Sequence, residues 1–283
     1  MTKLERLRTA ASIPPAFRGA GRVAKSRDLI QRRVAGTLEF NSSVWKVAKP
    51  QLKLETGGKC AYCESPTDTV AHGDVEHYRP KSKYWWLAYC YDNYLYACQI
   101  CNQVHKGDEF PIHSTTGIWT GPALPEPPTP EAIATLSVTL TPDALELNAG
   151  HALAEFLVAA GKEKAGLVDP YVTDPDPLFK WVANDVLKVV KVAAASNHVA
   201  ATRAFEGAEA SYGLNREELK RNRWKTYTDF VVLKDSLKAF EAAGIEAALQ
   251  QRIRDQIKAM TQVDAPYAGM IRYFVKEFGL TVS

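Results

Sequence analysis

Four of the five cysteines form two pairs with the spacing that a tetrahedral metal site requires. Two residues separate Cys60 from Cys63, and two separate Cys98 from Cys101. This gap lets both sulfurs of a pair reach one ion, and two pairs complete four-coordination. A closed site of this kind leaves no position for substrate, so we expect a structural Zn²⁺ that stabilises a segment with little core of its own. The fifth cysteine, Cys90, is expected to be a small buried apolar residue.

A second group of residues, between and just after these pairs, is suited to hydrolysis. Glu76 and His77 are adjacent, Asn93 follows them, and Asn102 comes directly after the last cysteine. Imidazole titrates near neutrality, so His77 can take a proton from water. The oxygens of Glu76 and Asn102 suit a hard cation such as Mg²⁺, and Asn93 can bond the backbone or His77 and orient the ring. A base, a cation and rigid positioning are what phosphodiester hydrolysis requires.

Four basic residues flank this group and are candidates for contacts with phosphate through charge-assisted hydrogen bonds. They are Arg79, Lys81, Lys83 and Lys106. Each of them, taken alone, is also typical of a solvated surface cation.

A further set of basic residues recurs near the start of an expected C-terminal helix. Arg216, Lys220 and Arg223 have the spacing of one helical face. This face could bind nucleic acid or an acidic partner, and a plain solvated face is the alternative.

Several segments resemble the HNH nucleases, which have a ββα-metal fold. The segments are CAYCE, DVEHYRPKS, NYLYACQICN and KGDEFP. The resemblance implies that His77 is the general base, that Glu76 and Asn102 ligate a catalytic metal, and that Asn93 is the positioning asparagine. Asn102 stands where the family name would place a histidine, which favours Mg²⁺ or Mn²⁺ over a zinc held by histidines.

Within this family the chain is similar to the HNH nuclease subunit of the Septu anti-phage defence system. The later segments VDPYVTDPDPLFKW and YGLNREELKRNR add weaker support. The resemblance implies a nucleic-acid substrate, with DNA favoured and RNA possible, and a partner ATPase with an ABC-type core. Two alternatives stay open: a stand-alone restriction-type HNH endonuclease, and a zinc knuckle that binds nucleic acid without cutting it.

The expected fold is α+β, with a zinc-stapled ββα-metal HNH module between N-terminal helices and a mainly helical C-terminal part containing a small β-hairpin. The expected parts are 1–58 (N-terminal helices), 59–112 (the module) and 113–283 (partner docking). Apolar periodicity predicts two helices over 25–56, interrupted at Pro50 and ended by Gly57 and Gly58.

Patterns in the C-terminal part predict several further elements. A proline-rich loop spans 121–131, and alternating residues indicate a short strand over 137–147. A short helix is expected over 151–166 and a hairpin over 178–192, bent at Asn184. Residues beyond 198 are expected to be helical. There Asn215 and Glu218 form a capping box, and a single amphipathic helix runs from Leu237 to Met260.

Bulk composition is that of an ordinary globular protein, with 46% hydrophobic and 24% charged residues and a net charge of +3. This charge permits a polyanionic partner but does not demand one, so a nucleic-acid site must be local. No window approaches the ~20 apolar residues of a membrane span, and the N-terminus lacks the apolar stretch of a secretory signal. A cytoplasmic location is therefore expected.

Overall fold

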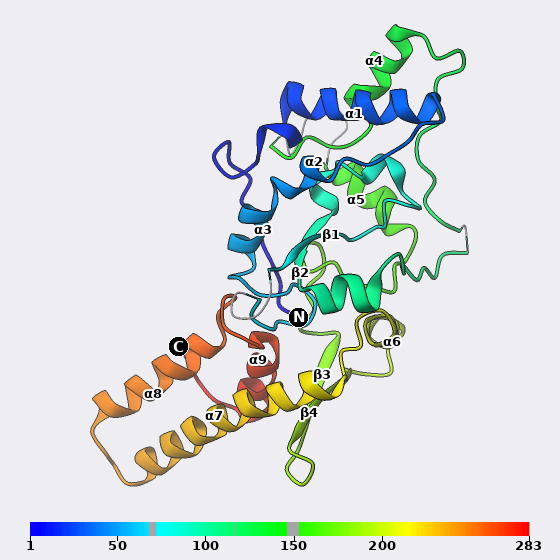
Figure 1. The fold of residues 1–283 in the computed structure, drawn as a ribbon. Helices are drawn as coiled ribbons and strands as arrows, with labels where there is room; N and C mark the ends of the chain where they lie inside the picture. Colours follow the sequence, from blue (N-terminus) through cyan, green and yellow to red (C-terminus); the bar gives the residue numbers. More distant parts are fainter. Residues whose placement is uncertain (68–71, 116, 146–152, 283) are drawn as a thin grey trace.

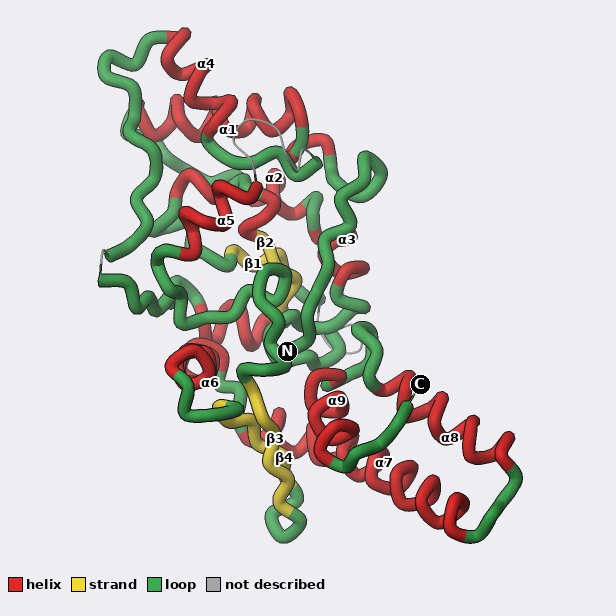
Figure 2. The backbone as a smooth tube through the Cα atoms, turned by 180° about the vertical axis from the view of Figure 1, so that it is seen from behind, coloured by secondary structure: helices red, strands yellow, loops and turns green. Residues whose placement is uncertain are grey.

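The molecule is elongated in the computed structural model, which describes residues 1–67, 72–115, 117–145 and 153–282. Figure 1 shows the N-terminal helices at one end, a small sheet in the middle and a pair of long helices at the other end. Seen from behind in Figure 2, helices and loops surround the central sheet, while a second hairpin extends beyond them.

The N-terminal part contains three α-helices rather than the two expected. They are α1 (Gly19–Val34), α2 (Ser42–Lys46) and α3 (Lys49–Glu55), preceded by the 3₁₀ turn η1 (Pro15–Phe17). The interruption predicted at Pro50 lies just before it, between α2 and α3, and this proline occupies the first turn of α3, where its missing N–H costs nothing. The third helix arises because the chain also leaves α1 near Gly36, whose φ of 68° is left-handed. Gly57 and Gly58 end α3 as predicted, with φ values of 61° and 74°.

The central sheet consists of two antiparallel strands, β1 (Asp74–His77) and β2 (Tyr94–Ala97). Asp74 pairs with Ala97 and His77 with Tyr94. Two 3₁₀ turns, η2 (Trp85–Leu87) and η3 (Tyr91–Asn93), lie between the strands. A π-helical turn, η4 (Ile100–Lys106), follows β2.

The segment after the sheet follows its prediction only in part. It contains α4 (Pro130–Thr139), which was not expected, and α5 (Leu153–Gly161), which confirms the short helix expected over 151–166. The strand expected over 137–147 is wrong where it is described, because 137–139 belong to α4 and 140–145 are bends and loop. Its last residues, 146–147, lie outside the described residues. The Thr129 side chain caps α4 by accepting from the amide of Ala132, and Pro130 occupies the first turn, so the start of α4 favours a helix over the alternating pattern.

The second hairpin confirms the prediction over 178–192. Its strands are β3 (Phe179–Asn184) and β4 (Val189–Ala194), joined by a four-residue turn. The side-chain amide of Asn215 covers the outer edge of β4, since its Oδ1 accepts from the Val192 N–H and its Nδ2 donates to the Val192 carbonyl, both at 2.9 Å. Asn215 therefore does not cap a helix as the predicted capping box required, and Arg216 occupies the N-cap position.

The remaining chain is helical, as predicted, although its boundaries differ. The helices are α6 (Val199–Tyr212), α7 (Glu217–Ala242), α8 (Ala247–Met260) and α9 (Ala268–Glu277). The single helix expected from Leu237 to Met260 is wrong, because Gly244 adopts a φ of 64° and turns the chain between α7 and α8. The two helices then pack against each other as a pair.

The described residues confirm an α+β chain with two two-stranded sheets among helices. One buried cluster draws side chains from 1–58, 59–112 and 113–283, so the three segments share a core. The division into three parts stays a prediction. No helix in the described part of the chain is long and apolar enough to cross a bilayer.

Candidate functional site

The four predicted cysteine ligands converge on one point. Their sulfur atoms all lie within 4.8 Å of one another, and none of them forms a disulfide. Cys60 and Cys63 come from the turn before β1, which the Ala61 N–H ties to the Tyr96 carbonyl of β2 at 2.9 Å. Cys98 follows β2, and Cys101 lies within η4.

The dimensions of this cluster fit a zinc ion. A tetrahedral Zn–S bond of about 2.3 Å places neighbouring sulfurs about 3.8 Å apart. The sulfurs of Cys63 and Cys98 are 3.9 Å apart. The Cys101 N–H also points at the Cys98 sulfur, at 3.4 Å, and would stabilise a thiolate there. The cluster is therefore compatible with a structural Zn²⁺ held by four thiolates.

Glu76, a predicted metal ligand, is a buried carboxylate on β1. Its Oε1 forms an ion pair with the Lys106 ammonium at 2.6 Å and lies 3.5 Å from the Tyr62 hydroxyl. Desolvation raises the pKa of Glu76, and the charge of Lys106 acts against that rise. Lys106 also donates to the His77 carbonyl at 3.1 Å, so one ammonium fixes both neighbouring residues.

His77, the predicted base, is held in one orientation by three contacts. Its Nε2 lies 2.9 Å from the Ala88 carbonyl oxygen, which can only accept, so Nε2 carries the proton and Nδ1 keeps its lone pair. Trp45 and Tyr94 pack edge-on against the ring, at centroid distances of 5.0 and 5.1 Å. Burial lowers the pKa of His77 to about 3, so the ring is neutral at pH 7.

Asn93, the predicted positioning residue, bonds backbone rather than the His77 ring. Its Oδ1 accepts from the Arg79 N–H at 2.8 Å, and its Nδ2 donates to the Arg79 carbonyl at 2.9 Å. A longer bond of 3.4 Å reaches the carbonyl of Leu87, next to the Ala88 that holds His77. The fully buried amide thus joins the chain after β1 to the turn that contacts the base.

Asn102 lies in η4, the π-helical turn that also carries Cys101 and Lys106. Its carbonyl accepts from the Gly107 N–H at 2.8 Å, which closes the turn at a glycine with φ of 47°. Its side chain is half-buried and faces the same cavity as β1. Single π-helical turns are a recurrent feature of functional sites, where the wider turn changes the direction of a side chain.

One cavity of ≈ 480 Å³ brings the predicted residues together. All four β1 residues line it, together with Asn102 of η4 and residues of α2 and the start of α3. The lining contains Ser42, Trp45, Lys46, Lys49, Asp74, Val75, Glu76, His77, Pro80, Lys81, Asn102, Gln103, Gly107 and Asp108.

Comparison with known proteins identifies one partial similarity. Part of the chain is similar to Septu protein PtuB. That protein, from Bacillus mycoides (strain KBAB4), is 38% identical over 79 residues, which cover 23% of this chain and 27% of the relative. No family model matches the chain, and no solved structure matches it. The chain is thus related to Septu PtuB over a limited segment and spans about a quarter of that relative's length.

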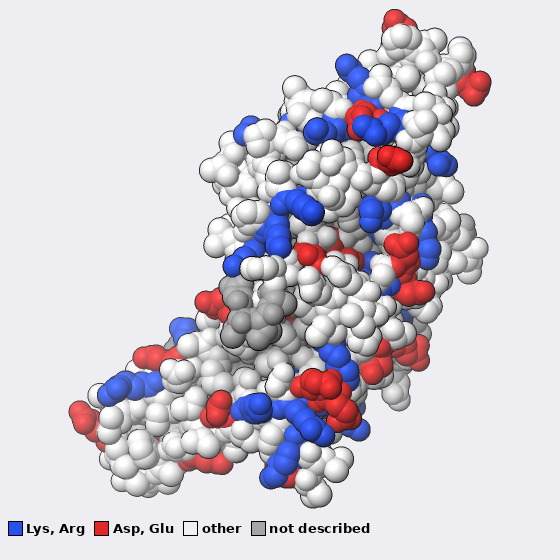
Figure 3. All heavy atoms as spheres, in the orientation of Figure 1, with Lys and Arg blue, Asp and Glu red and all other residues white. Residues whose placement is uncertain are grey.

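Two lysines that line the cavity were missed by the sequence analysis. They are Lys46 of α2 and Lys49 of α3. Figure 3 shows basic side chains gathered over α2 and α3, beside acidic ones over β1. Lys46 and Lys49 are three residues apart in a basic, helical part of the sequence, and this spacing could have indicated that they lie on one face.

The four predicted phosphate contacts occupy different environments. Lys81 lines the cavity, whereas Lys83 is exposed outside it. Arg79 is 7% exposed and pairs with Glu163 at 2.8 Å, and Lys106 is 1% exposed and pairs with Glu76. Arg79 and Lys106 therefore fit internal ion pairs better than contacts with phosphate.

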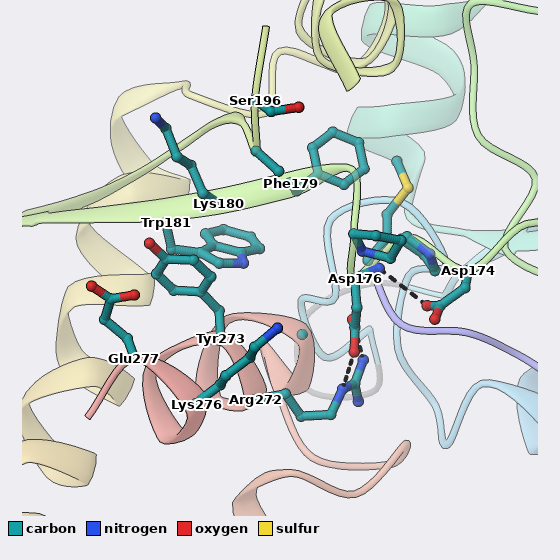
Figure 4. A pocket seen from close by; sticks show the side chains of 15 residues that line it. Asp174, Asp176, Phe179, Lys180, Trp181, Ser196, Arg272, Tyr273, Lys276 and Glu277 are labelled. Carbon is teal, nitrogen blue, oxygen red and sulfur yellow. Dashed lines mark hydrogen bonds and ion pairs between the residues drawn. The ribbon is translucent and has the colours of Figure 1, made fainter. Parts of the chain in front are cut away.

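A larger cavity, of ≈ 790 Å³, lies between β3, α9 and the 174–177 turn. Figure 4 shows Trp181 and Tyr273 on its walls and Arg272 directed at Asp176, with which it forms a double ion pair at 2.7 and 2.8 Å. None of the residues predicted for hydrolysis or metal binding lines it. Its mixed charges do not favour one class of ligand.

Proposed function

We propose that this protein is a metal-dependent HNH nuclease that hydrolyses phosphodiester bonds in nucleic acid, with Glu76, His77, Asn93 and Asn102 in the roles implied by the resemblance. The observation that carries this proposal is the shared cavity, into which a base, two oxygen ligands and three lysines converge from separate elements. The partial similarity to Septu PtuB supports it.

In this proposal His77 Nδ1 takes a proton from the attacking water. The Ala88 carbonyl fixes the tautomer by accepting from Nε2, and it also accepts from the Tyr94 hydroxyl at 2.7 Å. Burial disfavours the imidazolium, but a phosphate bound beside the ring would raise its pKa, because a negative charge stabilises the protonated form. Asn93 holds the backbone on which this geometry depends.

Glu76 and Asn102 would hold the divalent cation. Within the described residues, the contacts of Glu76 with Lys106 and Tyr62 both use Oε1, so Oε2 is the oxygen that a cation would take. Carboxylate and amide oxygens suit Mg²⁺ or Mn²⁺. When bound, the cation offsets charge on the phosphate and on the leaving oxygen.

The direct test is cleavage of plasmid DNA and cellular RNA by the full chain. We expect cutting with Mg²⁺ or Mn²⁺ and none after dialysis against buffer without them; dialysis is used because a strong chelator would also strip zinc. Glu76→Gln should raise the Mg²⁺ concentration for half-maximal rate by about ten-fold or more, since a charged ligand is lost. The exposed Glu109 supplies the control, Glu109→Gln. Absence of cutting of both substrates, with the partner present, contradicts the proposal.

The cavity lysines are proposed to contact substrate phosphates. In a catalytically inactive background, we expect Lys49→Ala and Lys81→Ala each to weaken nucleic-acid binding by the same factor whatever the nucleotide sequence. Each should also reduce by about one the slope of the logarithm of the binding constant against the logarithm of the salt concentration. Lys83→Ala, outside the cavity, is the control and should leave the slope unchanged. Equal slopes for all three variants would exclude this path for the nucleic acid.

We further propose that the chain is the effector subunit of an anti-phage defence complex with an ABC-type ATPase partner. The similarity to Septu protein PtuB supports this role, and the long helical part after the module offers surface for docking. Co-expression with the neighbouring gene should yield a stable complex. A chain that remains monomeric in that experiment favours a stand-alone restriction-type nuclease, and binding without cleavage favours a zinc knuckle.

A further inference from the structure

The cysteine cluster presents a problem of charge. Four thiolates around one Zn²⁺ carry a net charge of −2, and three of the four cysteines are buried. Removing such charge from water is costly unless opposite charges or hydrogen-bond donors surround it. The structure should therefore supply positive groups near the cluster.

Arg216, which precedes α7, touches the cluster directly. Its two terminal nitrogens lie 3.8 and 3.7 Å from the Cys101 sulfur. The same guanidinium donates to the carbonyls of Tyr212 and Gly213, at 2.8 and 3.3 Å. These bonds fix the side chain between the end of α6 and the cysteines, so its position does not depend on a flexible arm.

We propose that Arg216 is a counter-charge of a four-thiolate metal centre, so that metal binding by the cysteines and docking of the start of α7 on them are coupled. Its positive charge offsets part of the net −2 of the loaded cluster. Tyr62 stacks on Tyr212 with ring centroids 3.9 Å apart, and this contact joins the turn that carries Cys60 and Cys63 to the end of α6. The inference adds a charge-balancing residue to the zinc site, and it does not depend on nuclease activity.

Arg216 therefore acts through the thiolates as a positioning residue. Removing a partner of a metal ligand typically weakens metal binding by about 10–100-fold. We expect Arg216→Gln to lower the Zn²⁺ affinity of the full chain by at least about ten-fold, and Arg216→Lys, which keeps the charge, to recover part of that loss. Arg221, whose side chain is 71% exposed on the same helix, provides the matched control Arg221→Gln, with no change expected.

The measurement is competition for Zn²⁺ with a chromophoric chelator, together with absorption spectra of the Co²⁺-loaded chain. A perturbed thiolate-to-cobalt band in Arg216→Gln, with an unchanged band in Arg221→Gln, would support the proposal. Wild-type affinity and spectrum in Arg216→Gln would overturn it. A wild-type chain that binds no Zn²⁺ would also overturn it, and that result is separate from any loss or retention of nuclease activity.

Discussion

Replacement of His77 by alanine is expected to lower the rate of phosphodiester cleavage by about 10²–10⁴-fold, the usual contribution of a positioned general base. Because Nε2 of His77 donates its proton to the Ala88 carbonyl, only Nδ1 of this ring can accept a proton from water. Rates should be compared at saturating Mg²⁺, because the metal ligands remain in this variant. Zinc content and substrate affinity should stay near those of the wild type.

The control for this experiment is His72→Ala. His72 is exposed, precedes β1 and does not line the cavity. Its removal should leave the rate unchanged. An active His77→Ala variant would show that another group activates water and would remove the central residue of the proposed mechanism.

Loss of the cysteine cluster should have the largest effect on stability. We expect Cys98→Ser to abolish stoichiometric Zn²⁺ binding and to destabilise the segment around β1 and β2, because the metal would no longer join the turn before β1 to η4. Metal binding at structural sites supplies on the order of 10 kcal/mol, which exceeds the whole stability of many domains. Metal analysis and thermal unfolding, with and without chelator, would measure both effects.

Cys90 gives the matched control for the cluster. It is 1% exposed, it belongs to the hydrophobic core as the sequence predicted, and burial raises the pKa of its thiol to about 12. Cys90→Ala should therefore keep one equivalent of Zn²⁺ and lose only the stability that a small cavity costs. If Cys98→Ser kept full Zn²⁺ binding and cooperative unfolding, the four-cysteine site would be refuted.

Elements with strong local signals were predictable from the sequence. The hairpin of β3 and β4 follows from alternation and a turn, and Gly57 and Gly58 end a helix because they accept left-handed backbone. The strand expected over 137–147 failed because alternation of β-branched residues is a weak signal, and the N-cap at Thr129 favours α4 instead. The break between α7 and α8 was missed, since Gly244 had been included within a continuous amphipathic pattern.

Charged residues were the least predictable part of the candidate site. Arg79 had been assigned to phosphate, yet its partner Glu163 is 84 positions away. Arg216 and Arg223 had been considered for a surface face, yet one touches a cysteine sulfur and the other is buried. Burial of a long basic side chain depends on partners that no local pattern identifies.

The sequence by itself determined the groups that act together at short range: two cysteine pairs whose spacing suits one ion, and an adjacent acid and histidine. Ligand spacing is a property of neighbouring residues, so it can be read without a fold. Only the tertiary structure decided which cations face the cavity, which neutralise buried carboxylates and which face the cysteine cluster. Those choices depend on contacts between distant segments, because the cost of burying a charge is set by whatever the fold places beside it.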